Sequence, residues 1–463
     1  MFDLKTYVAR RKRLRNQVGS GVILFLGNDE SPMNYPDNPY HFRQDSSFLY
    51  FFGLNYPGLA ALIDIDEGRE TIFGNELTVD DIVWMGTQPT IKEKSEKVGV
   101  ENTAPLSKLK GVISTVKKQG RKIHFLPPYR AEHFLKIFDL MEIPPSEISA
   151  SASIKLIKAV VEQRNKKTRE EIAEIEKAVN ISADMHLTAY KMVRPGLSEA
   201  QIAAAVHKVA FESGCQLSFP IIATTHGETL HNHYYGNVLE HGDMFLLDAG
   251  AETPMGYAGD LSSTMPVDQK FTEKQKEIYQ VALNAHEAAV SALEPGVKFK
   301  DVHLLACKTI AEGMKALGFM KGDTEEAVAQ GAHALFFPCG TGHMMGLDVH
   351  DMENLGEVYV GYAGEAKSSQ FGLKSLRLAR ELEPGFVLTI EPGIYFIPEL
   401  IDMWKSEKKF TDFIDYEKVE AYKDFGGLRN EEDYLITETG HRLLGKPIPK
   451  TIEDVEAIRS YKK

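Results

Sequence analysis

The sequence predicts an α+β protein with two domains, an α/β domain over residues 1–158 and a larger domain over residues 159–463. Three observations predict this class. The chain has 463 residues, more than a single hydrophobic core usually serves. Its first part alternates short apolar runs with helical patterns, which is typical of an α/β domain. Its second part contains two similar segments, which indicate an internal repeat.

The composition favours a soluble, cytoplasmic protein and argues against nucleic acid as the main partner. Lys and Arg number 53 against 66 Asp and Glu, a formal net charge of -13, whereas nucleic-acid binding needs a basic surface. The three cysteines have no regular spacing, so we expect no disulfide framework. We expect no signal peptide and no transmembrane helix, because no apolar run has the required length.

The N-terminal domain is predicted from short strands and the helices between them. Residues 22–26 (Val-Ile-Leu-Phe-Leu) form an apolar run before Gly-Asn, and residues 60–65 form another before Glu-Gly. Both patterns are typical of buried strands that end in turns. Residues 104–142 indicate a helix, a strand and a second helix. A charged stretch over residues 154–169 then leads into a long amphipathic helix, which sets the domain boundary after residue 158.

The second domain repeats a pattern of turn, helix and strand. Arg-Pro-Gly-Leu at residues 194–197 precedes a capping box, and Glu-Pro-Gly-Val at residues 294–297 precedes the corresponding helix. Residues 242–250 and 385–393 are the two related strands. In each strand a carboxylate, Asp248 or Glu391, lies six residues after one glycine and two before another. The repeat predicts two halves about a pseudo-two-fold axis, with their carboxylates at the centre.

A central cluster of carboxylates predicts a metal site. Each half continues into a second acidic segment, which adds Asp260 and Glu431. Four carboxylates close together raise one another's pKa values, and cations relieve the repulsion. His343, between glycines, is the candidate imidazole ligand. Oxygen ligands with one imidazole suit Mn²⁺, Co²⁺, Fe²⁺ or Zn²⁺. Two such ions about 3.5–4 Å apart would generate a hydroxide nucleophile near neutral pH.

Each of these residues also has an ordinary structural interpretation. An isolated Asp248 is typical of a strand edge or turn, and an isolated His343 is typical of a hydrogen-bonded core histidine. Glu391-Pro392-Gly393 by itself is typical of a strand end. The pairing of carboxylates in the repeat favours the metal site over these alternatives.

Five segments, in this order, resemble the pita-bread metallopeptidases, which include methionine aminopeptidase, aminopeptidase P and prolidase. The segments are residues 247–250 (Leu-Asp-Ala-Gly), 257–260 (Tyr-Ala-Gly-Asp), 342–351 (Gly-His-Met-Met-Gly-Leu-Asp-Val-His-Asp), 389–395 (Thr-Ile-Glu-Pro-Gly-Ile-Tyr) and 427–433 (Gly-Leu-Arg-Asn-Glu-Glu-Asp). Residues 42–48 and 84–86 resemble the N-terminal domain of aminopeptidase P and eukaryotic-type prolidase. The resemblance therefore covers nearly the whole chain.

The resemblance implies a fold and a role for each site residue. It implies a pita-bread catalytic domain that holds two divalent ions, with manganese favoured, and hydrolyses the Xaa-Pro bond of peptides. The implied metal ligands are Asp248 on one ion, Asp260 and Glu431 on both, and His343 and Glu391 on the other. Glu391 would also take the proton of the attacking water, His231 and His350 would line the substrate site, and Arg429 would orient a metal carboxylate.

One position departs from this family. Cys339 stands where prolidases and aminopeptidases P have a histidine, four residues before His343. We expect Cys339 to be a small apolar wall residue rather than a nucleophile. His233 is an alternative to His231, because the two histidines are only two positions apart.

Arg377 favours prolidase within this family, because it matches the arginine that holds the product carboxylate there. The long segment 397–425, which is expected to cap the site, favours prolidase too. The main alternative is aminopeptidase P, which acts on longer peptides, and a binding module without catalysis is a further alternative. The resemblance also implies a homodimer with Trp84 near the partner's site.

Overall fold

The computed structural model describes residues 1–460, which divide into two compact units. Unit 1 consists of Met1–Arg164 and Met352–Tyr359. Unit 2 consists of Asn165–Asp351 and the described residues from Val360 onward. The boundary predicted after residue 158 falls within helix α8 (Ile154–Asn165). Among residues 1–460, no helix combines the length and the apolar character that crossing a membrane requires.

Unit 1 is built on a five-stranded sheet with the strand order β4-β3-β2-β1-β5. Its strands are β1 (Val22–Leu26), β2 (Ala60–Asp64), β3 (Arg69–Phe73), β4 (Asn102–Ala104) and β5 (Ile123–His124). Its helices are α1 (Leu4–Val18), α2 (Ser46–Phe52), α3 (Val79–Met85), α4 (Ile91–Glu96), α5 (Leu109–Lys118), α6 (Ala131–Met141), α7 (Pro145–Ser151) and most of α8, with short 3₁₀ turns at Leu106–Lys108 and Glu353–Leu355.

The elements predicted for unit 1 are present. The apolar run over residues 22–26 is β1, and the run over residues 60–65 is β2, which ends one residue early. The two strands pair antiparallel with Ile23 opposite Ile63. The helix, strand and helix predicted over residues 104–142 are α5, β5 and α6, and Ile113 and Ile137 from these helices pack into the core of the sheet.

Unit 2 contains the remaining strands in small sheets, with orders β10-β8-β7, β11-β14-β15, β12-β13 and β6-β9. Its strands are β6 (Gln216–Leu217), β7 (Ile222–Thr224), β8 (Met244–Asp248), β9 (Ala251–Glu252), β10 (Ser262–Pro266), β11 (Val387–Ile390), β12 (Gly393–Tyr395), β13 (Gly427–Arg429), β14 (Glu432–Ile436) and β15 (His441–Leu443). Its helices are α9 (Arg169–Met192), α10 (Glu199–Glu212), α11 (Glu273–Ser291), α12 (Phe299–Ala316), α13 (Thr324–Gln330), α15 (Pro398–Ser406), α16 (Tyr416–Glu420) and α17 (Ile452–Arg459), with α14 (Glu357–Val360) at the unit boundary and 3₁₀ turns at Ala332–Leu335 and Leu373–Ser375.

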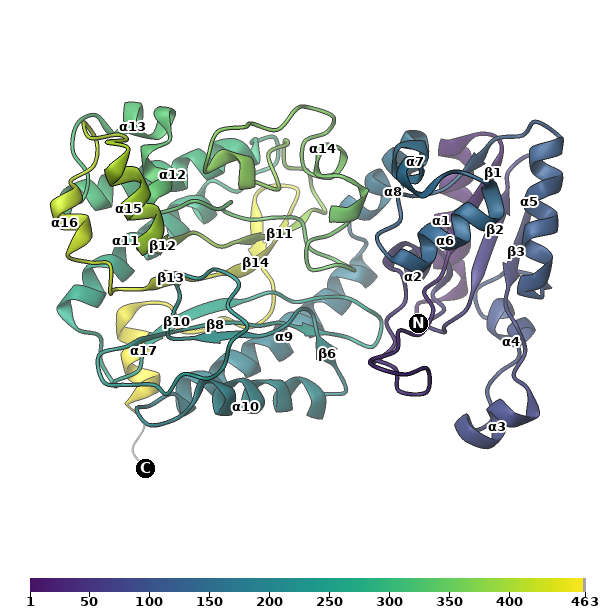
Figure 1. The fold of residues 1–463 in the computed structure, drawn as a ribbon, viewed down its shortest axis with the longest axis horizontal. Helices are drawn as coiled ribbons and strands as arrows, with labels where there is room; N and C mark the ends of the chain where they lie inside the picture. The colour runs from purple at the N-terminus through teal and green to yellow at the C-terminus, as the bar shows by residue number, and fades with distance from the viewer. Residues whose placement is uncertain (461–463) are drawn as a thin grey trace. The chain divides into compact units, whose positions relative to one another are not determined.

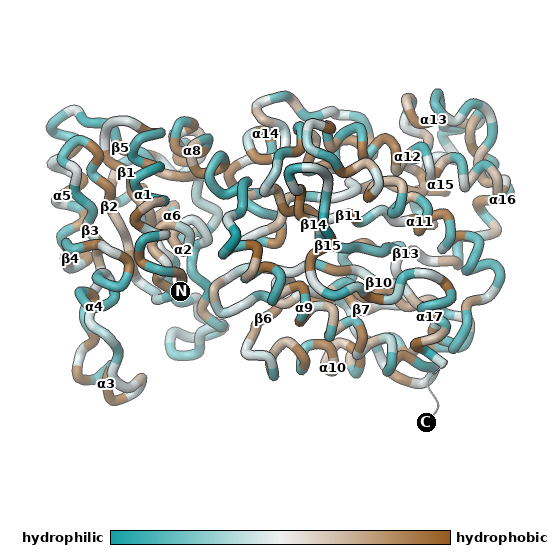
Figure 2. Tube along the Cα trace, turned by 180° about the vertical axis from the view of Figure 1, so that it is seen from behind, coloured by the Kyte–Doolittle hydropathy of each residue, from teal (hydrophilic) through white to brown (hydrophobic). Residues whose placement is uncertain are grey.

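Within unit 2, two helix pairs enclose the strands that carry the predicted site. Helix α9 packs on α10 and α11 packs on α12. Figures 1 and 2, which view the molecule from opposite sides, both show the central strands of unit 2 between these two helix layers. The side chains of α9, α11 and the strands form one continuous apolar core. In this arrangement the ends of the central strands are available to carry the side chains of the predicted site.

The predicted internal repeat is visible in matching backbone hydrogen bonds. Gly196 N donates to Leu239 O over 2.8 Å, and Gly296 N donates to Leu382 O over 2.9 Å. The next helix begins in each half with a second matching bond, from Glu199 N to Asn237 O (3.0 Å) and from Phe299 N to Arg380 O (2.9 Å). The two halves therefore repeat one backbone arrangement of turn, helix start and facing segment, as the sequence predicts.

Candidate metal centre

The four predicted carboxylates lie at the ends of strands that meet in the middle of unit 2. Asp248 is the last residue of β8, and Glu391 directly follows β11. Asp260 lies two residues before β10, and Glu431 directly precedes β14. Strand β10 pairs with β8, and β14 pairs with β11. A bridge between Ser262 and Glu431 joins the two strand pairs, so all four carboxylates come together.

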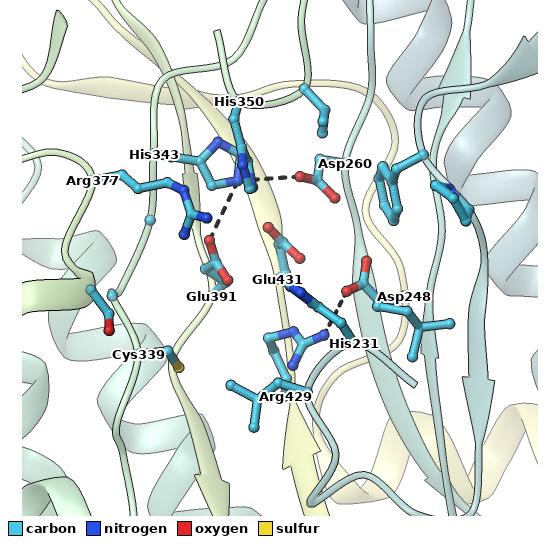
Figure 3. A pocket seen from close by; sticks show the side chains of 18 of the residues that line it. His231, Asp248, Asp260, Cys339, His343, His350, Arg377, Glu391, Arg429 and Glu431 are labelled. Atoms are coloured by element: carbon cyan, nitrogen blue, oxygen red, sulfur yellow. Dashed lines mark hydrogen bonds and ion pairs between the residues drawn. The ribbon is translucent and has the colours of Figure 1, made fainter. Parts of the chain in front are cut away.

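The predicted imidazole faces this cluster in a fixed orientation. His343 Nδ1 lies 3.0 Å from the carbonyl oxygen of Met344, and a carbonyl can only accept, so Nδ1 carries the proton. Nε2 then points at Asp260 Oδ2 and Glu391 Oε1 over 3.3 and 3.4 Å. Figure 3 shows His343, Asp260, Glu391 and Glu431 directed at a common centre. Nε2 is thus the ring nitrogen that would bind a cation in that centre, once its proton is displaced.

Burial makes this cluster unfavourable without a positive charge. Desolvation raises the pKa of Asp260 and Glu391, and it raises the pKa of Glu431 well above its ordinary value, with the neighbouring carboxylates adding to the effect. Burial opposes protonation of His343, but the hydrogen bond to Asp260 and the charge of Glu391 outweigh it and raise its pKa. The isolated cluster therefore retains protons, which a divalent cation would displace.

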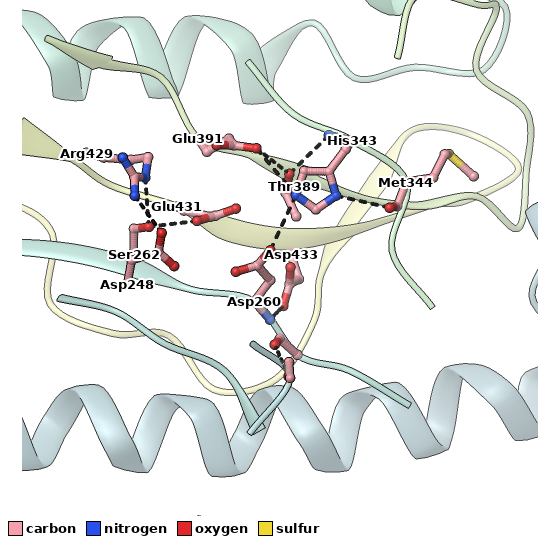
Figure 4. A network of polar contacts seen from close by, with 12 residues as sticks. Asp248, Asp260, Ser262, His343, Met344, Thr389, Glu391, Arg429, Glu431 and Asp433 are labelled. Atoms are coloured by element: carbon pink, nitrogen blue, oxygen red, sulfur yellow. Dashed lines mark hydrogen bonds and ion pairs between the residues drawn. The ribbon is translucent and has the colours of Figure 1, made fainter. Parts of the chain in front are cut away.

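A network behind the cluster holds the carboxylates in place, as Figure 4 shows. Arg429, which is buried, donates from Nη2 to Asp248 Oδ2 over 2.5 Å, from Nε to Ser262 Oγ over 3.0 Å and from Nη1 to Tyr395 OH over 2.9 Å. Ser262 Oγ donates in turn to Glu431 Oε2 over 2.7 Å. One arginine and one serine thus connect carboxylates of both strand pairs, and the orienting role of Arg429 stays a prediction.

The residues present fit divalent cations. Ligand atoms of Asp260, His343 and Glu431 all lie within 4.8 Å of one another, and all three residues are buried. Oδ1 of Asp248 is buried without a hydrogen-bond partner among residues 1–460, although the other oxygen is paired. An unpaired buried carboxylate oxygen is costly, and a cation in the cluster would satisfy it.

All the other site residues predicted in the catalytic domain line one pocket with this cluster. The pocket has a volume of about 470 Å³. Its walls include His231, His350, Arg377 and Cys339, and His233 as well, so the alternative to His231 remains open. In Figure 3 the guanidinium of Arg377 points toward the cluster, whereas Cys339 lies at the edge. None of residues 397–425 lines the pocket, so the cap expected from that segment is not found.

Two side chains of the pocket wall, those of His231 and Cys339, have pKa values shifted from their ordinary values. Burial, together with the charge of Arg429, lowers the pKa of His231, which keeps that imidazole neutral near pH 7. Burial, together with the charge of Glu391, raises the pKa of Cys339 to about 12. A thiol with this pKa stays protonated at neutral pH and is a poor nucleophile, which agrees with the wall role expected for Cys339.

Several residues of the site were not assigned a role from the sequence. The apolar wall consists of Phe219, Pro220, Ile222, Leu230 and Val349. Asp433 Oδ2 accepts from Asp260 N over 3.1 Å, and Thr389 Oγ1 contacts both His343 N (3.2 Å) and Glu391 Oε1 (3.3 Å). Thr389, Asp433 and Val349 lie inside the recognised motifs, whereas no sequence pattern marks the rest of the apolar wall, which depends on how distant segments meet.

Trp84, the residue predicted to face a partner subunit, lies in unit 1 on helix α3. Its side chain is 87% exposed, and no residue of α3 is buried. The tube of α3 is nevertheless largely apolar in Figure 2.

The fold and the donor set together define a metallopeptidase class of protein, and comparison with known proteins identifies the family. The model described as metallopeptidase family M24 matches residues 173–438, and the model for the aminopeptidase P N-terminal domain matches residues 7–124. The chain belongs to metallopeptidase family M24, as its motifs predict.

Individual relatives cover almost the whole chain. The Xaa-Pro dipeptidase of Homo sapiens is 31% identical over 96% of this chain and 90% of its own length. The Xaa-Pro aminopeptidase of Escherichia coli (strain K12) is 31% identical over 97% and 96% of the two chains. Among solved structures, an Escherichia coli aminopeptidase P in complex with substrate matches with a TM-score of 0.81 and 27% identity, over 99% of this chain and 98% of that chain. The Pseudomonas aeruginosa aminopeptidase PepP has the same fold, with a TM-score of 0.81, 24% identity and the same coverage.

Proposed function

We propose that this protein hydrolyses the Xaa-Pro bond of peptides and acts as an Xaa-Pro dipeptidase. The observation that carries the proposal is one pocket that contains both the cluster of Asp260, His343, Glu391 and Glu431 and the guanidinium of Arg377. A guanidinium fork pairs well with the free carboxylate at the end of a dipeptide. The human relative named Xaa-Pro dipeptidase supports the same function.

The cluster is proposed to hold two divalent ions, with manganese favoured. Asp248 would bind one ion, His343 and Glu391 the other, and Asp260 and Glu431 would bridge them. When bound, the ions supply an activated water for attack on the peptide carbonyl. The unpaired Asp248 Oδ1 and the direction of His343 Nε2, which faces Asp260 and Glu391, support this assignment. One related solved structure is a zinc-substituted Escherichia coli aminopeptidase P in complex with product, which makes zinc the first alternative to test against manganese.

The chain's own residues would carry the remaining steps. Glu391 takes a proton from the water, a role that suits a carboxylate directed at the centre of the cluster. His231 and His350 donate hydrogen bonds to the oxyanion and the scissile amide. Arg377 holds the carboxylate of the substrate, and the apolar wall around Phe219 and Val349 receives the proline ring.

The second candidate function is that of an aminopeptidase P, which removes the first residue of longer Xaa-Pro peptides. The Escherichia coli Xaa-Pro aminopeptidase supports it with an identity equal to that of the human dipeptidase. A free peptide carboxylate at proline is then unnecessary, and Arg377 would have no special role.

Hydrolysis of Gly-Pro and of Gly-Pro-Gly-Gly by enzyme reloaded with Mn²⁺ separates the candidates. A dipeptidase cleaves Gly-Pro, and Arg377→Gln raises the KM for this substrate. Arg380→Gln is the matched control, because Arg380 pairs with Glu383 and does not line the pocket. Preference for Gly-Pro-Gly-Gly, with no effect of Arg377→Gln, would establish the aminopeptidase. Cleavage of neither peptide with any divalent ion would favour a binding module.

We also propose a homodimer that works in the cytoplasm. The exposed apolar helix α3 with Trp84 supports an interface, and three free cysteines suit a reducing compartment. Light scattering of the wild type and of Trp84→Ala tests the dimer, and a monomeric, fully active wild type would refute it. Cell fractionation tests the location.

A further inference from the structure

The loop over residues 225–237 carries part of the pocket wall but contains no helix or strand. It follows strand β7 and ends before Val238, which pairs with Ser198. Leu230, His231 and His233 of this loop line the pocket. A loop without regular structure depends on side chains to fix its shape. The position of His231 over the cluster therefore depends on whatever holds the two ends of this loop.

A single buried carboxylate contacts both ends. Glu199, the first residue of α10, is completely buried. Its Oε1 accepts hydrogen bonds from Thr225 N (2.9 Å), Thr225 Oγ1 (3.4 Å) and Asn237 Nδ2 (3.1 Å). Its Oε2 accepts from Asn237 N over 3.1 Å. Thr225 begins the loop and Asn237 ends it, so this carboxylate closes the loop at its base.

The internal repeat shows what this carboxylate adds. Phe299 occupies the corresponding position in the second half and makes the same backbone bond at the helix start. The helix and its facing segment therefore form without a carboxylate at this position. A buried carboxylate is unfavourable unless hydrogen bonds satisfy it, and the bonds that satisfy Glu199 include donors from both loop ends.

Two further contacts hold the part of the loop on either side of His231. Asn232, next to His231, donates from Nδ2 to Thr224 Oγ1 at the end of β7 over 3.1 Å. Gly227 passes so close to strand β13 that a Cβ on it would lie 2.1 Å from Gly427 O. With its base closed by Glu199, the loop has little freedom to move His231 relative to the cluster.

We propose that Glu199 is a positioning residue for catalysis, which fastens the loop over residues 225–237 and so holds His231 against the substrate. The catalytic part of this proposal rests on the proposed Xaa-Pro hydrolysis. Glu199 does not line the pocket and acts through the loop alone. Since a misplacement of about 1 Å can reduce a rate on the order of 100-fold, release of the loop reduces kcat.

The first test compares Glu199→Gln with Glu174→Gln in the full-length, Mn²⁺-loaded protein. Glutamine keeps the size of Glu199, but its amide group replaces one acceptor with a donor that faces other donors. Glu174 is the control, a buried carboxylate of the neighbouring helix α9 that pairs with the surface residue Lys177. For Glu199→Gln we expect kcat for Gly-Pro to fall about 10–100-fold with KM nearly unchanged. Hydrogen exchange over residues 225–237 should accelerate, while metal content stays constant. The control should match the wild type in all of these measurements.

A double-mutant cycle with His231→Ala identifies the route of the effect. If Glu199 acts by positioning His231, Glu199→Gln has no further effect on kcat once His231 is alanine. Independent, multiplying effects would overturn the proposal, as would unchanged hydrogen exchange in the loop. Should Glu199→Gln fail to fold, Asn237→Ala removes only the Nδ2 bond and should give a smaller loss with the same pattern. If the wild type hydrolyses neither Gly-Pro nor Gly-Pro-Gly-Gly, the proposed function fails, and hydrogen exchange alone decides whether Glu199 fastens the loop.

Discussion

The two halves of unit 2 share a backbone frame but use it for different parts of the site. In the first half the helix start carries Glu199, whose carboxylate fastens a loop with His231 and His233. In the second half it carries Phe299, which is completely buried and packs close to Gly342. The first half thus holds an irregular loop by polar contacts, whereas the second half fixes the backbone beside His343 by packing.

This difference separates the two tasks of the site. A ligand imidazole must stay in one position, and a glycine enclosed by apolar packing achieves that: a Cβ on Gly342 would lie 2.0 Å from Thr389 O and 3.0 Å from Phe299. A substrate-binding histidine needs a loop that reaches into the pocket, and loops of this kind carry function in many folds. We infer that the second half holds its imidazole ligand, His343, by packing, whereas the first half holds the substrate-facing His231 on a loop fastened by polar contacts.

The largest predicted effects contrast one histidine from each half. His343→Ala should lower kcat/KM by about 1,000-fold or more and release metal, because the loss of a ligand costs several kcal/mol of transition-state stabilisation. His231→Ala should lower kcat about 100-fold but leave the metal content unchanged, because it removes a hydrogen-bond donor to the oxyanion. Steady-state kinetics with metal analysis measures both.

His207→Ala, an exposed change on helix α10, is the control for both variants. Loss of metal in His231→Ala would place a ligand in the first-half loop and break the comparison. Full metal occupancy in His343→Ala would remove this imidazole from the set of ligands.

The second predicted effect is a loss of activity on substitution of Arg429, the residue that connects the two halves. Arg429, at the end of β13, pairs with Asp248 of the first half and with Tyr395 of the second. Arg429→Lys keeps the charge but loses the fork, so kcat/KM should fall about 10–100-fold, as is typical for residues that orient metal ligands. The same change at the exposed Arg442, which pairs with Glu176, should have no effect. An unaffected Arg429→Lys would show that the halves are held without this link.

The sequence predicts the repeat and the ligands better than it predicts the walls. Asp248 and Glu391 are found because strand ends repeat at the same spacing between glycines, and the structure brings them together as that spacing implies. A cap from residues 397–425 is not found: none of these residues lines the pocket, and Ile401 and Trp404 pack into the core. The fastening of the loop by Glu199 has no local pattern, since its partners lie far along the chain and become neighbours only in the fold.

An effect on stability rather than on activity is expected from pH, through a pair of buried histidines at matching positions. His186 on α9 and His286 on α11 each precede the glycine of their own half by ten residues. Burial lowers the pKa of both to about 4. The unfolded chain, with a pKa near 6.5, therefore binds the proton first as the pH falls. The stability from each neutral histidine is fully present above pH 6.5 and is lost toward pH 4, by about 3 kcal/mol per histidine. Urea unfolding at pH 7.5 and pH 5 measures this loss, and equal stabilities would contradict the neutral assignment.

The same histidines differ between the halves in their hydrogen bonds. His186 donates to Ala249 O over 3.0 Å and accepts from Ser263 Oγ over 2.6 Å. Neither ring nitrogen of His286 has a hydrogen-bond partner among residues 1–460. At pH 7.5, His186→Leu should reduce the free energy of unfolding by about 1–3 kcal/mol, whereas His286→Leu should change it by less than about 1 kcal/mol. Equal losses would show that packing, not hydrogen bonding, sets the contribution of both.

The smallest effect is expected at Cys339, on the pocket wall supplied by the second half. Since burial raises the pKa of this thiol to about 12, Cys339→Ala removes only a neutral wall group. We expect kcat/KM to stay within about threefold of the wild-type value. The free energy of unfolding should change by about 1 kcal/mol. Cys215→Ala, a buried thiol of the first half outside the pocket, is the control. Iodoacetamide should label Cys339 slowly at pH 8, because its thiolate fraction is on the order of 1 in 10,000. A 1,000-fold loss of activity in Cys339→Ala, or rapid labelling, would mean that the second half contributes a reactive group beside its ligand, and the division of tasks between the halves would have to be abandoned.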